Sequence, residues 1–477
     1  MTILHKRIAK SLGLLGALVW LGGCAIIDLD AHSRSVDDFA KSKLGTSAAM
    51  QRTAEDRAAA VSKARAQLEQ PLTQDGAVRL ALLLSPAFQA LLADSASNAA
   101  GAAQSARLSN PIFTFERLVR KDAGGVDIDI GRMLSVSLLE LIYLPSRIRS
   151  ADAAQTQARL RAATATVETV TNVRQSWVRA VAAQQSVTYF SQVMEAADAS
   201  AELARRMYKV GNFSQLQRAR QQAFYAEAVA DLARAKQAAL AAREQLIRQL
   251  GLNADLAEKL VLPARLPDLP KTTMTESAVA QSAVTERLDI RMATADLEAV
   301  AARNGFATAT SYINAFHLAG VNNSETGKPR QRGYELELML PLFDWGDARR
   351  AQAAAEYAAS MQRVHQTAVD ASSSVREQYS AYRTSYDVAN HYRTEIVPLR
   401  KLIADEMLLK YNGMLTGVFD LLAETRAQIN SVILAIDAER DFWLADAALH
   451  ATLLGKPTST ANMTTPAGQT APAGAGH

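Results

Sequence analysis

Two very long stretches without glycine or proline constrain the fold more than any other feature of this sequence. The first runs from Ser146 to Val210 and the second from Asp347 to Val397. Because glycine and proline are the residues that interrupt helices, each stretch predicts one continuous helix. At about 1.5 Å per residue, the first would extend for roughly 100 Å. A compact globular domain has no use for such a helix, whereas a device that crosses a wide compartment does.

A second helical stretch follows each long one across a glycine turn. Ser214 to Leu250 and Val418 to Leu454 are again free of glycine and proline. Apolar and small residues recur in all these stretches with the spacing of coiled coils, so the chain is predicted to be mostly α with paired helices. The predicted contact positions are Val173, Ala180, Val187, Met194, Ala201 and Tyr208; Ala219, Ala223, Ala226, Ala230, Ala233, Leu240 and Ile247; and Val418, Leu422, Thr425, Ile429, Val432, Ile436 and Trp443.

Four short segments in which apolar and polar residues alternate interrupt the helical pattern. A pair of them precedes each long helix, and the alternation predicts strands with one apolar and one polar face. The segments are "PIFTFER" (111–117), "VDIDIGRMLSVSLLELIY" (126–143), "SYINAFHLA" (311–319) and "GYELELMLPLF" (333–343). The carboxylates on the polar faces are Asp127, Asp129, Glu335 and Glu337.

The order of these segments repeats with an offset of about 200 residues, which indicates an internal duplication. Each half contains a helix, two strands, a very long helix, a turn and a long helix, and a proline-rich segment joins the halves. The predicted divisions are a signal peptide (1–23), an N-terminal arm (24–72), a first repeat (73–262), a linker (263–272), a second repeat (273–455) and a disordered tail (456–477).

The strands raise the question of how their edges are covered. Four strands cannot close into a barrel, and open edges in water promote aggregation. Four strands from each of three chains would make a twelve-stranded transmembrane barrel, with leucines toward lipid and carboxylates toward a wet lumen. Phe343 and Trp345 would suit the aromatic belt of such a barrel, and "GVNNSETGKPRQRG" (320–333) its outer loop. The alternative is a soluble amphipathic hairpin packed on helices.

The turns between the paired helices would form the tip of each coiled coil, far from the strands. A glycine is followed three residues later by a hydroxyl residue in both turns: Gly211 with Ser214, and Gly413 with Thr416. A duct that is open at rest would leak, so this end is expected to constrict.

Charged and aromatic residues beside the turns are the candidates for that constriction. Seven residues after the turn glycines come Arg218 and Asp420, so the repeat places opposite charges at equivalent positions. In a symmetric assembly the two would form a charged ring, to which Tyr411 and Phe419 would add. The alternative is that both charges simply face water, since exposed ion pairs contribute only about 0–1 kcal/mol.

The N-terminus has the layout of a bacterial lipoprotein signal. Basic residues precede a short apolar run, and "LGGC" ends at the sole cysteine, Cys24. At this position a cysteine would be acylated and become the new N-terminus, and Ala25 after it favours delivery to the outer membrane by analogy. The alternative is a short membrane anchor with an incidental cysteine.

The sequence indicates no catalytic, metal or cofactor site. The seven histidines are scattered, without ligand spacing, and no phosphate-binding loop or nucleophile motif is present. Basic and acidic residues are interspersed, so the net charge of +4 predicts solvated helix faces and no nucleic-acid partner.

Three segments resemble the TolC-like outer-membrane efflux proteins. "LPLFDWGDARRAQAAA" (340–355) is similar to that family's strand-to-helix crossover, and "ERLDIRMATADLEAVAAR" (286–303) to the start of its second repeat. "YNGMLTGVFDLLAETR" (411–426) is similar to its helix-turn-helix tip. The family's Tyr-x-x-Gly tip is present at Tyr208 to Gly211, whereas the second half has a glycine one residue sooner after its tyrosine.

The resemblance covers about residues 73–455 and implies the exit duct of a tripartite efflux or type I secretion system. Such a duct is a homotrimer without a cofactor that carries substrate passively across periplasm and outer membrane. It implies a periplasmic adaptor and an inner-membrane pump as partners. The alternative function is a structural coiled-coil lipoprotein that spaces the envelope without a pore. The substrate class, whether drug, metal ion or polypeptide, is left open by the sequence.

Overall fold

A computed structural model describes residues 29–122, 125–277, 279, 287–310, 316–339 and 343–456. The predicted signal peptide with Cys24, and the tail beyond Lys456, lie outside the described residues. The chain forms two compact units. One comprises residues 1–35, 95–159 and 298–358, and the other comprises 36–94, 160–297 and 359–477.

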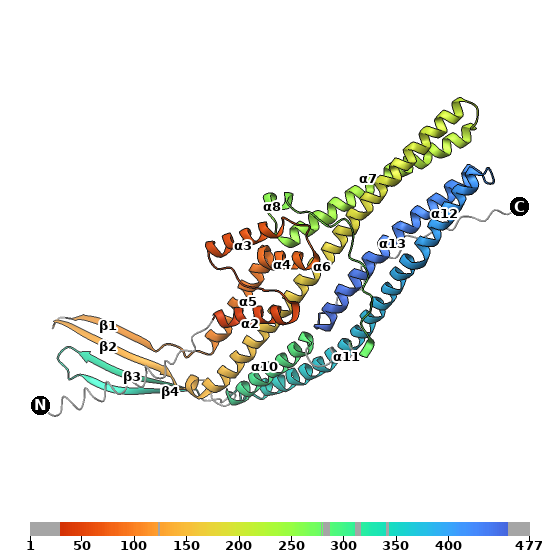
Figure 1. Cartoon of the computed structure of the whole chain (residues 1–477). Coiled ribbons are helices and arrows are strands. Elements are labelled where there is room, and N and C mark those ends of the chain that lie inside the picture. Colours follow the sequence, from red (N-terminus) through yellow and green to blue (C-terminus); the bar gives the residue numbers. More distant parts are fainter. Residues whose placement is uncertain are drawn as a thin grey trace. The chain divides into compact units, whose positions relative to one another are not determined.

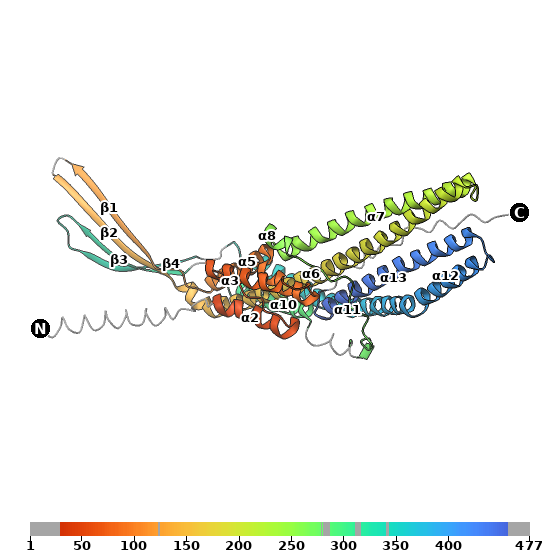
Figure 2. The ribbon, with the colours of Figure 1, turned by 45° about the horizontal axis from the view of Figure 1, so that its top comes forward.

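The first unit contains an open antiparallel sheet with the strand order β1-β2-β3-β4 (Figure 1). The strands are β1 (Ile112–Asp122), β2 (Gly125–Ser137), β3 (Phe316–Glu325) and β4 (Gln331–Leu338). Figure 2 shows β1 and β2 side by side as one hairpin, with β3 and β4 forming the second. Strands from all four predicted segments therefore join in one sheet, whose outer strands β1 and β4 each leave one edge unpaired. Residues 311–315 and 340–342 of the predicted segments lie outside the described residues.

Strand boundaries differ from those predicted in all four strands. β1 continues five residues further, to Asp122, and β4 ends at Leu338, before the predicted end at 343. β2 ends at Ser137, and the next residues, which were predicted to extend the strand, start a helix. β3 continues into the predicted outer loop, because Gly320 and Val321 pair with Leu134 and Met133 of β2. Pairing with a neighbouring strand thus overrides the loop-like composition of this segment, and the connection shrinks to residues 326–330.

The long helices extend beyond the stretches that predict them. α6 (Leu138–Lys209) has 72 residues and runs through Pro145. In the second half α11 (Asp347–His391) passes through a π-helical turn, η1 (Tyr392–Ile396), into α12 (Val397–Asn412). Proline lacks an amide hydrogen and its ring crowds the carbonyl four residues earlier, so Pro398 accounts for the wider π turn just before it.

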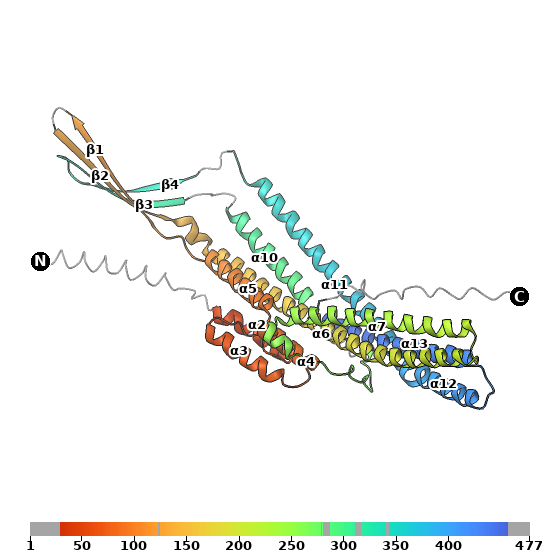
Figure 3. The same cartoon turned by 90° about the horizontal axis from the view of Figure 1, so that it is seen from above.

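In the second unit the helices pair as predicted. α7 (Gln215–Leu250) lies beside α6, and α13 (Val418–Leu453) beside α12 (Figure 3). Ser214 caps α7 through a capping box with Gln217, and Gly251 ends it in a left-handed conformation with φ of +70°. A Cβ atom on Gly251 would lie 2.6 Å from Cδ of Pro86, so this position requires glycine.

The predicted N-terminal arm contains two helices and joins the hydrophobic core. It forms α2 (Leu29–Leu44) and α3 (Ala54–Gln67), and Leu68 and Leu72 lie in the main hydrophobic core. The indole of Trp177 on α6 donates a hydrogen bond of 2.8 Å to the carbonyl of Leu72. The remaining helices are α4 (Gln74–Leu84), α5 (Pro86–Ser105), α8 (Ala254–Glu258) and α10 (Leu288–Thr310).

The predicted linker is held against α11 and α13 by aromatic side chains. Trp443 on α13 donates from Nε1 to the carbonyl of Pro267 at 3.1 Å, and the Tyr386 hydroxyl on α11 donates to that of Pro270 at 3.1 Å. Both residues pack beside Phe442, whose side chain is fully buried. The linker is therefore a strap with defined contacts.

The coiled-coil contact positions are confirmed in part. Val173, Ala180 and Ala201 of α6 are buried as predicted. On α7 the prediction is wrong, because none of its seven predicted positions is buried and Leu240 is 53% exposed. The buried residues of α7 include Leu232 and Leu246 instead. The buried residues and the predicted positions each recur with heptad spacing. α7 therefore carries one apolar stripe that packs on its partner and a second that is exposed in a single chain.

Among the described helices, none alone has the length and apolar character needed to cross a membrane. By the same test α4 and α5 qualify only jointly, as a pair bent by 55°.

Candidate functional site: a two-faced sheet and the helical turns

The register of the sheet places the four predicted lumen carboxylates on one face. Residues directly opposite each other in neighbouring strands point to the same side, and the side alternates along each strand. Asp129 lies opposite Glu325, Glu335 lies opposite Ala319, and Glu337 lies opposite His317. We call this side the polar face. The predicted residues on it are Asp127, Asp129, Glu335 and Glu337.

The other side of the sheet, the apolar face, exposes large hydrophobic side chains. Eight of them are between 43% and 81% exposed in the single chain: Phe113, Phe115, Val119, Val126, Leu134, Tyr334, Leu336 and Leu338. A contiguous apolar surface of this kind marks contact with a membrane or another protein. The sheet thus has one face for an apolar environment, one face for water, and two unpaired edges.

A network that sequence reasoning missed ties the sheet to its flanking helices. The carboxylate of Glu140 on α6 accepts hydrogen bonds from the amide and the hydroxyl of Ser109 at 2.8 and 2.7 Å. Arg147 pairs with Glu140 at 3.2 Å and donates to the carbonyl of Ser105 at 2.7 Å. Burial acts to raise the pKa of Glu140, but the Ser109 hydrogen bonds and the Arg147 charge outweigh it, and the pKa lies below its ordinary value.

The two turns of the helix pairs have the same geometry, although their sequences differ in spacing. Gly211 has φ of +79° and follows Tyr208 by three residues. In the second turn Gly413 has φ of −81°, and the left-handed residue is Met414, with φ of +58°, three residues after Tyr411. The turn is therefore not one residue shorter, because methionine occupies the place that glycine takes in the first half.

This shift corrects the predicted equivalence of the two charged candidates. Counted from the left-handed residues, Arg218 corresponds to Leu421, and Asp420 corresponds to Gln217. Thr416 likewise does not match Ser214, because Gly417 is the N-cap residue of α13. The sequence comparison went wrong because it matched glycine with glycine, whereas the backbone matches one left-handed residue with another.

The gate candidates lie in separate local contacts. The Arg218 guanidinium stacks over the Tyr208 ring at 4.2 Å, within the α6–α7 pair. Asp420, exposed in the first turn of α13, accepts a hydrogen bond of 3.0 Å from the Thr416 hydroxyl. Tyr411 is 36% exposed. Phe419 lies in α13, but its side chain is outside the described part of the structure.

A different residue links α13 to the first helix pair. Arg426 stacks over the Phe224 ring of α7 at 4.5 Å and approaches the Glu227 carboxylate to 3.9 Å. Ile429 packs in the same cluster. No sequence signal identifies this contact, because it depends on how the two pairs are rotated about their axes.

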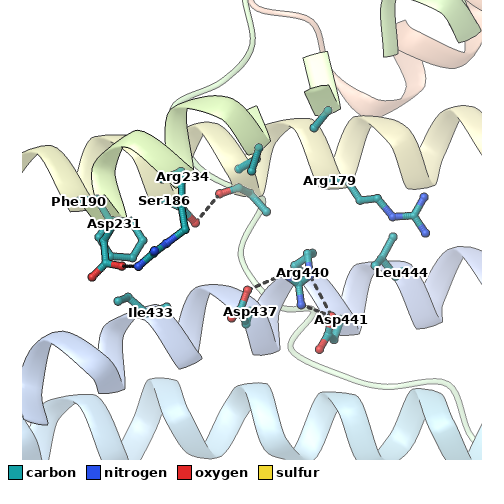
Figure 4. A pocket seen from close by; sticks show the side chains of 15 residues that line it. Arg179, Ser186, Phe190, Asp231, Arg234, Ile433, Asp437, Arg440, Asp441 and Leu444 are labelled. Atoms are coloured by element: carbon teal, nitrogen blue, oxygen red, sulfur yellow. Dashed lines mark hydrogen bonds and ion pairs between the residues drawn. The ribbon is translucent and has the colours of Figure 1, made fainter. Parts of the chain in front are cut away.

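A groove of 540 Å³ lies between α6, α7 and α13 (Figure 4). Arg440 lies on the α13 side of it and pairs with Asp437 and Asp441 on its own helix. Burial raises the pKa of Asp437 against the opposing charge of Arg440. Arg179 enters from α6, and its pKa is lowered by burial and by the nearby Arg440 charge. Charged side chains line the groove, and within the described ranges no cluster of His, Cys, Asp or Glu suits a metal ion.

The comparison with known proteins supports this architecture. No protein-family model and no curated protein matches the sequence. Solved structures do match: VceC, an outer membrane protein from Vibrio cholerae, has a TM-score of 0.68 at 15% identity over 80% of this chain and 96% of its own. The outer-membrane channel OprN has a TM-score of 0.68 at 19% identity, over 82% of this chain and 91% of its own.

The open state of the MtrE outer membrane channel from Neisseria gonorrhoeae is similar to the same degree. Its TM-score is 0.66 at 18% identity, over 82% of this chain and 91% of that chain. At such identities the likeness concerns the fold. The chain therefore has the fold of the TolC-like outer-membrane channels, as the resemblance of its sequence motifs implies.

Proposed function

We propose that this chain is the outer-membrane exit duct of a tripartite efflux system, and that it acts as a homotrimer. In this assembly β4 of one chain pairs with β1 of the next, so that three sheets close into a twelve-stranded barrel. The helix pairs continue the duct through the periplasm. Transport through it is passive, and the energy comes from an inner-membrane pump joined to the tip by an adaptor. A type I secretion system would use the same duct with a different pump.

One observation carries the proposal: a four-stranded sheet with an exposed apolar face, an acidic face and two free edges. A single sheet of this kind is unstable in water, because both edges and the apolar face are unsatisfied. Closure in a membrane satisfies all three at once, since only closed barrels and helices leave no unpaired backbone groups in lipid. The carboxylates then line an aqueous lumen.

The helices support the same assembly. Apolar side chains that the single chain leaves exposed follow their outer surfaces, as a subunit interface requires. They include Leu240 on α7, Val369 on α11, and Leu399, Leu402 and Leu409 on α12. Acylation of Cys24, which lies outside the described residues, would hold the N-terminus at the inner leaflet of the outer membrane.

Conductance in planar bilayers tests the proposal. The full-length protein, purified from membranes, is expected to form long-lived pores that prefer cations, because carboxylates line the lumen. The variant Glu335→Gln with Glu337→Gln should keep the pore and lower its cation preference. The matched control is Glu356→Gln on α11, outside the strands, which should conduct like the parent.

The experiment also separates the duct from the structural spacer. A protein that is trimeric and lipidated but never conducts would favour the spacer. A protein that remains monomeric in detergent would contradict both the pore and the shared barrel.

A further inference from the structure

The charged residues of the strands are sorted between the two faces of the sheet. Every strand carboxylate whose side chain is described lies on the polar face, together with Arg120. The other four basic residues of the strands lie on the apolar face: Arg117, Lys121, Arg132 and Arg332. Solvated surfaces mix both signs of charge, so this separation indicates that each face meets a different environment. We call the four residues the basic band.

The basic band begins where the purely apolar part of the face ends. Nearest the helices, three successive rows contain only apolar, aromatic or glycine residues, and the row of Arg332 lies six residues, about 20 Å of strand at roughly 3.3 Å per residue, beyond Leu338. The next row toward the strand turns contains Arg332 and Arg132. They precede Tyr334 and Leu134 of the third row by two residues each. The rows are Leu338 with Phe316; Leu336, Leu318 and Val136; and Tyr334, Gly320, Leu134 and Phe113.

No carboxylate faces the band across a strand pair in the described sheet. Arg132 lies opposite Phe115 and Arg117 opposite Ile130, while Arg332 lies opposite Asn322. The Arg132 guanidinium is 6.0 Å from the centre of the Phe115 ring, which leaves its N–H groups free to bind an anion. Guanidinium groups bind phosphate in a bidentate manner, more specifically than an ammonium group does.

The position of the band decides which anion it meets. The apolar band of an outer-membrane barrel is about 25 Å tall. Met339 and Phe343, exposed beyond Leu338, extend the apolar surface toward the helices, so the basic band lies at the opposite margin of this surface, where long arginine side chains reach the head groups. The band lies toward the strand turns, at the end of the sheet away from the helices. If the helices extend into the periplasm, as proposed above, this end lies in the outer leaflet.

We propose that the basic band binds the phosphate groups of the phosphorylated glycolipid of the outer leaflet, from the outer wall of the barrel. This inference rests on the proposed function, because it requires the apolar face to contact lipid. Arg132 and Arg332, which lie in one row, form the core of the site, and Arg117 lies one row above. The lipid phosphates supply the counter-charges that the sheet lacks on this face.

Titration of the purified full-length protein in zwitterionic detergent with fluorescent lipid A tests the proposal. The triple variant Arg117→Gln, Arg132→Gln, Arg332→Gln should bind more weakly by about tenfold for each guanidinium that contacts phosphate. Arg120→Gln, on the same strand but the polar face, should bind like the parent. Changing the same three residues to lysine should restore most of the affinity, because the positive charge is kept.

Three outcomes overturn the proposal. In the first, the triple glutamine variant binds lipid A like the parent. In the second, Arg120→Gln weakens binding as much as the triple variant does. In the third, phosphatidylglycerol competes as well as lipid A at equal phosphate concentration, which would make the band a general anionic-lipid surface. Insertion into phosphatidylcholine vesicles distinguishes this failure from that of the proposed function. A parent that inserts but shows no band-dependent binding refutes the lipid site alone, and a parent that does not insert refutes both.

Discussion

The second helical turn depends on one strained residue. Met414 has φ of +58°, a conformation that costs residues other than glycine about 1–2 kcal/mol. We predict that Met414→Gly stabilises the protein by about 1 kcal/mol, measured as a higher midpoint of thermal unfolding by circular dichroism. The reverse change in the first turn, Gly211→Met, should destabilise it by a similar amount, because Gly211 has φ of +79°.

A neighbouring glycine provides the control. Gly413 has φ of −81°, and an added Cβ would meet no atom closer than 3.5 Å, so Gly413→Ala should be tolerated. Gly211→Ala should be costly although the space there is open, since the cost comes from the backbone. If Gly413→Ala were the more damaging of the two, the matching of Gly413 with Gly211 by sequence would be correct after all.

Glu140 is expected to make stability depend on pH. Its folded-state pKa is lowered, so its contribution is complete above the ordinary glutamate pKa of about 4.3 and is lost as pH falls through the lower folded value. Glu140→Gln should cost about 1–3 kcal/mol at pH 7 and much less at pH 3. Thermal unfolding between pH 3 and 7 measures the difference, with the exposed Glu195→Gln on the same helix as control. An equal loss at both pH values would contradict the charge-based role.

Among the structural elements, the linker between the halves is held by side chains from two helices. Replacing Trp443 and Tyr386 by phenylalanine keeps an aromatic ring beside Phe442 at both positions, a smaller one at 443, but removes the hydrogen bonds to Pro267 and Pro270. Each lost bond should cost about 0.5–1.5 kcal/mol, and the strap should open locally more often.

Limited digestion with trypsin measures this opening, because Arg265 and Lys271 flank the bonded prolines. We expect faster cleavage at these two residues in the double variant and an unchanged rate in Tyr357→Phe, where the tyrosine is 39% exposed on α11. Unchanged cleavage in the double variant would show that packing alone fixes the strap.

Helix and strand identities could be predicted because they depend on local patterns that persist over many residues. The absence of glycine and proline predicted the first and last residues of helices α7 and α13 to within one residue. The patterns failed where long-range contacts decide the outcome. β2 recruits the loop-like residues 320–325 into β3, and Pro398 is accommodated by a π turn instead of ending the helix.

At the scale of the whole molecule, the sorting of carboxylates to one face was predictable because strand alternation is strict. The contacts near the turns were not. Rotation of each helix about its axis selects which residues meet, so Arg426 and Glu227 come together although nothing in their spacing indicates it. The same rotation leaves Leu240 exposed in the single chain.

The separate contacts of Asp420 and Arg218 near the helical turns change the effect that each charge is expected to have in an assembled trimer. Asp420 is exposed in the first turn of α13, where the helix N-terminus favours a negative charge. Three copies around one axis would attract cations to the tip. Arg218 instead stacks on Tyr208 within its own helix pair. We therefore predict that Asp420→Asn lowers the cation preference of single channels, measured as the reversal potential in a salt gradient, and that Arg218→Gln changes it little.

Gln217 supplies the matched control, since it occupies the position in the first turn that Asp420 occupies in the second. Gln217→Asp should increase the cation preference, because it adds three carboxylates at the same level of the tip. The exchange of Arg218→Asp with Asp420→Arg should not restore parental behaviour, because the two side chains make separate contacts, one with Tyr208 and the other with Thr416. A restored reversal potential in the exchanged protein would instead show that the trimer brings the two charges together into one ring.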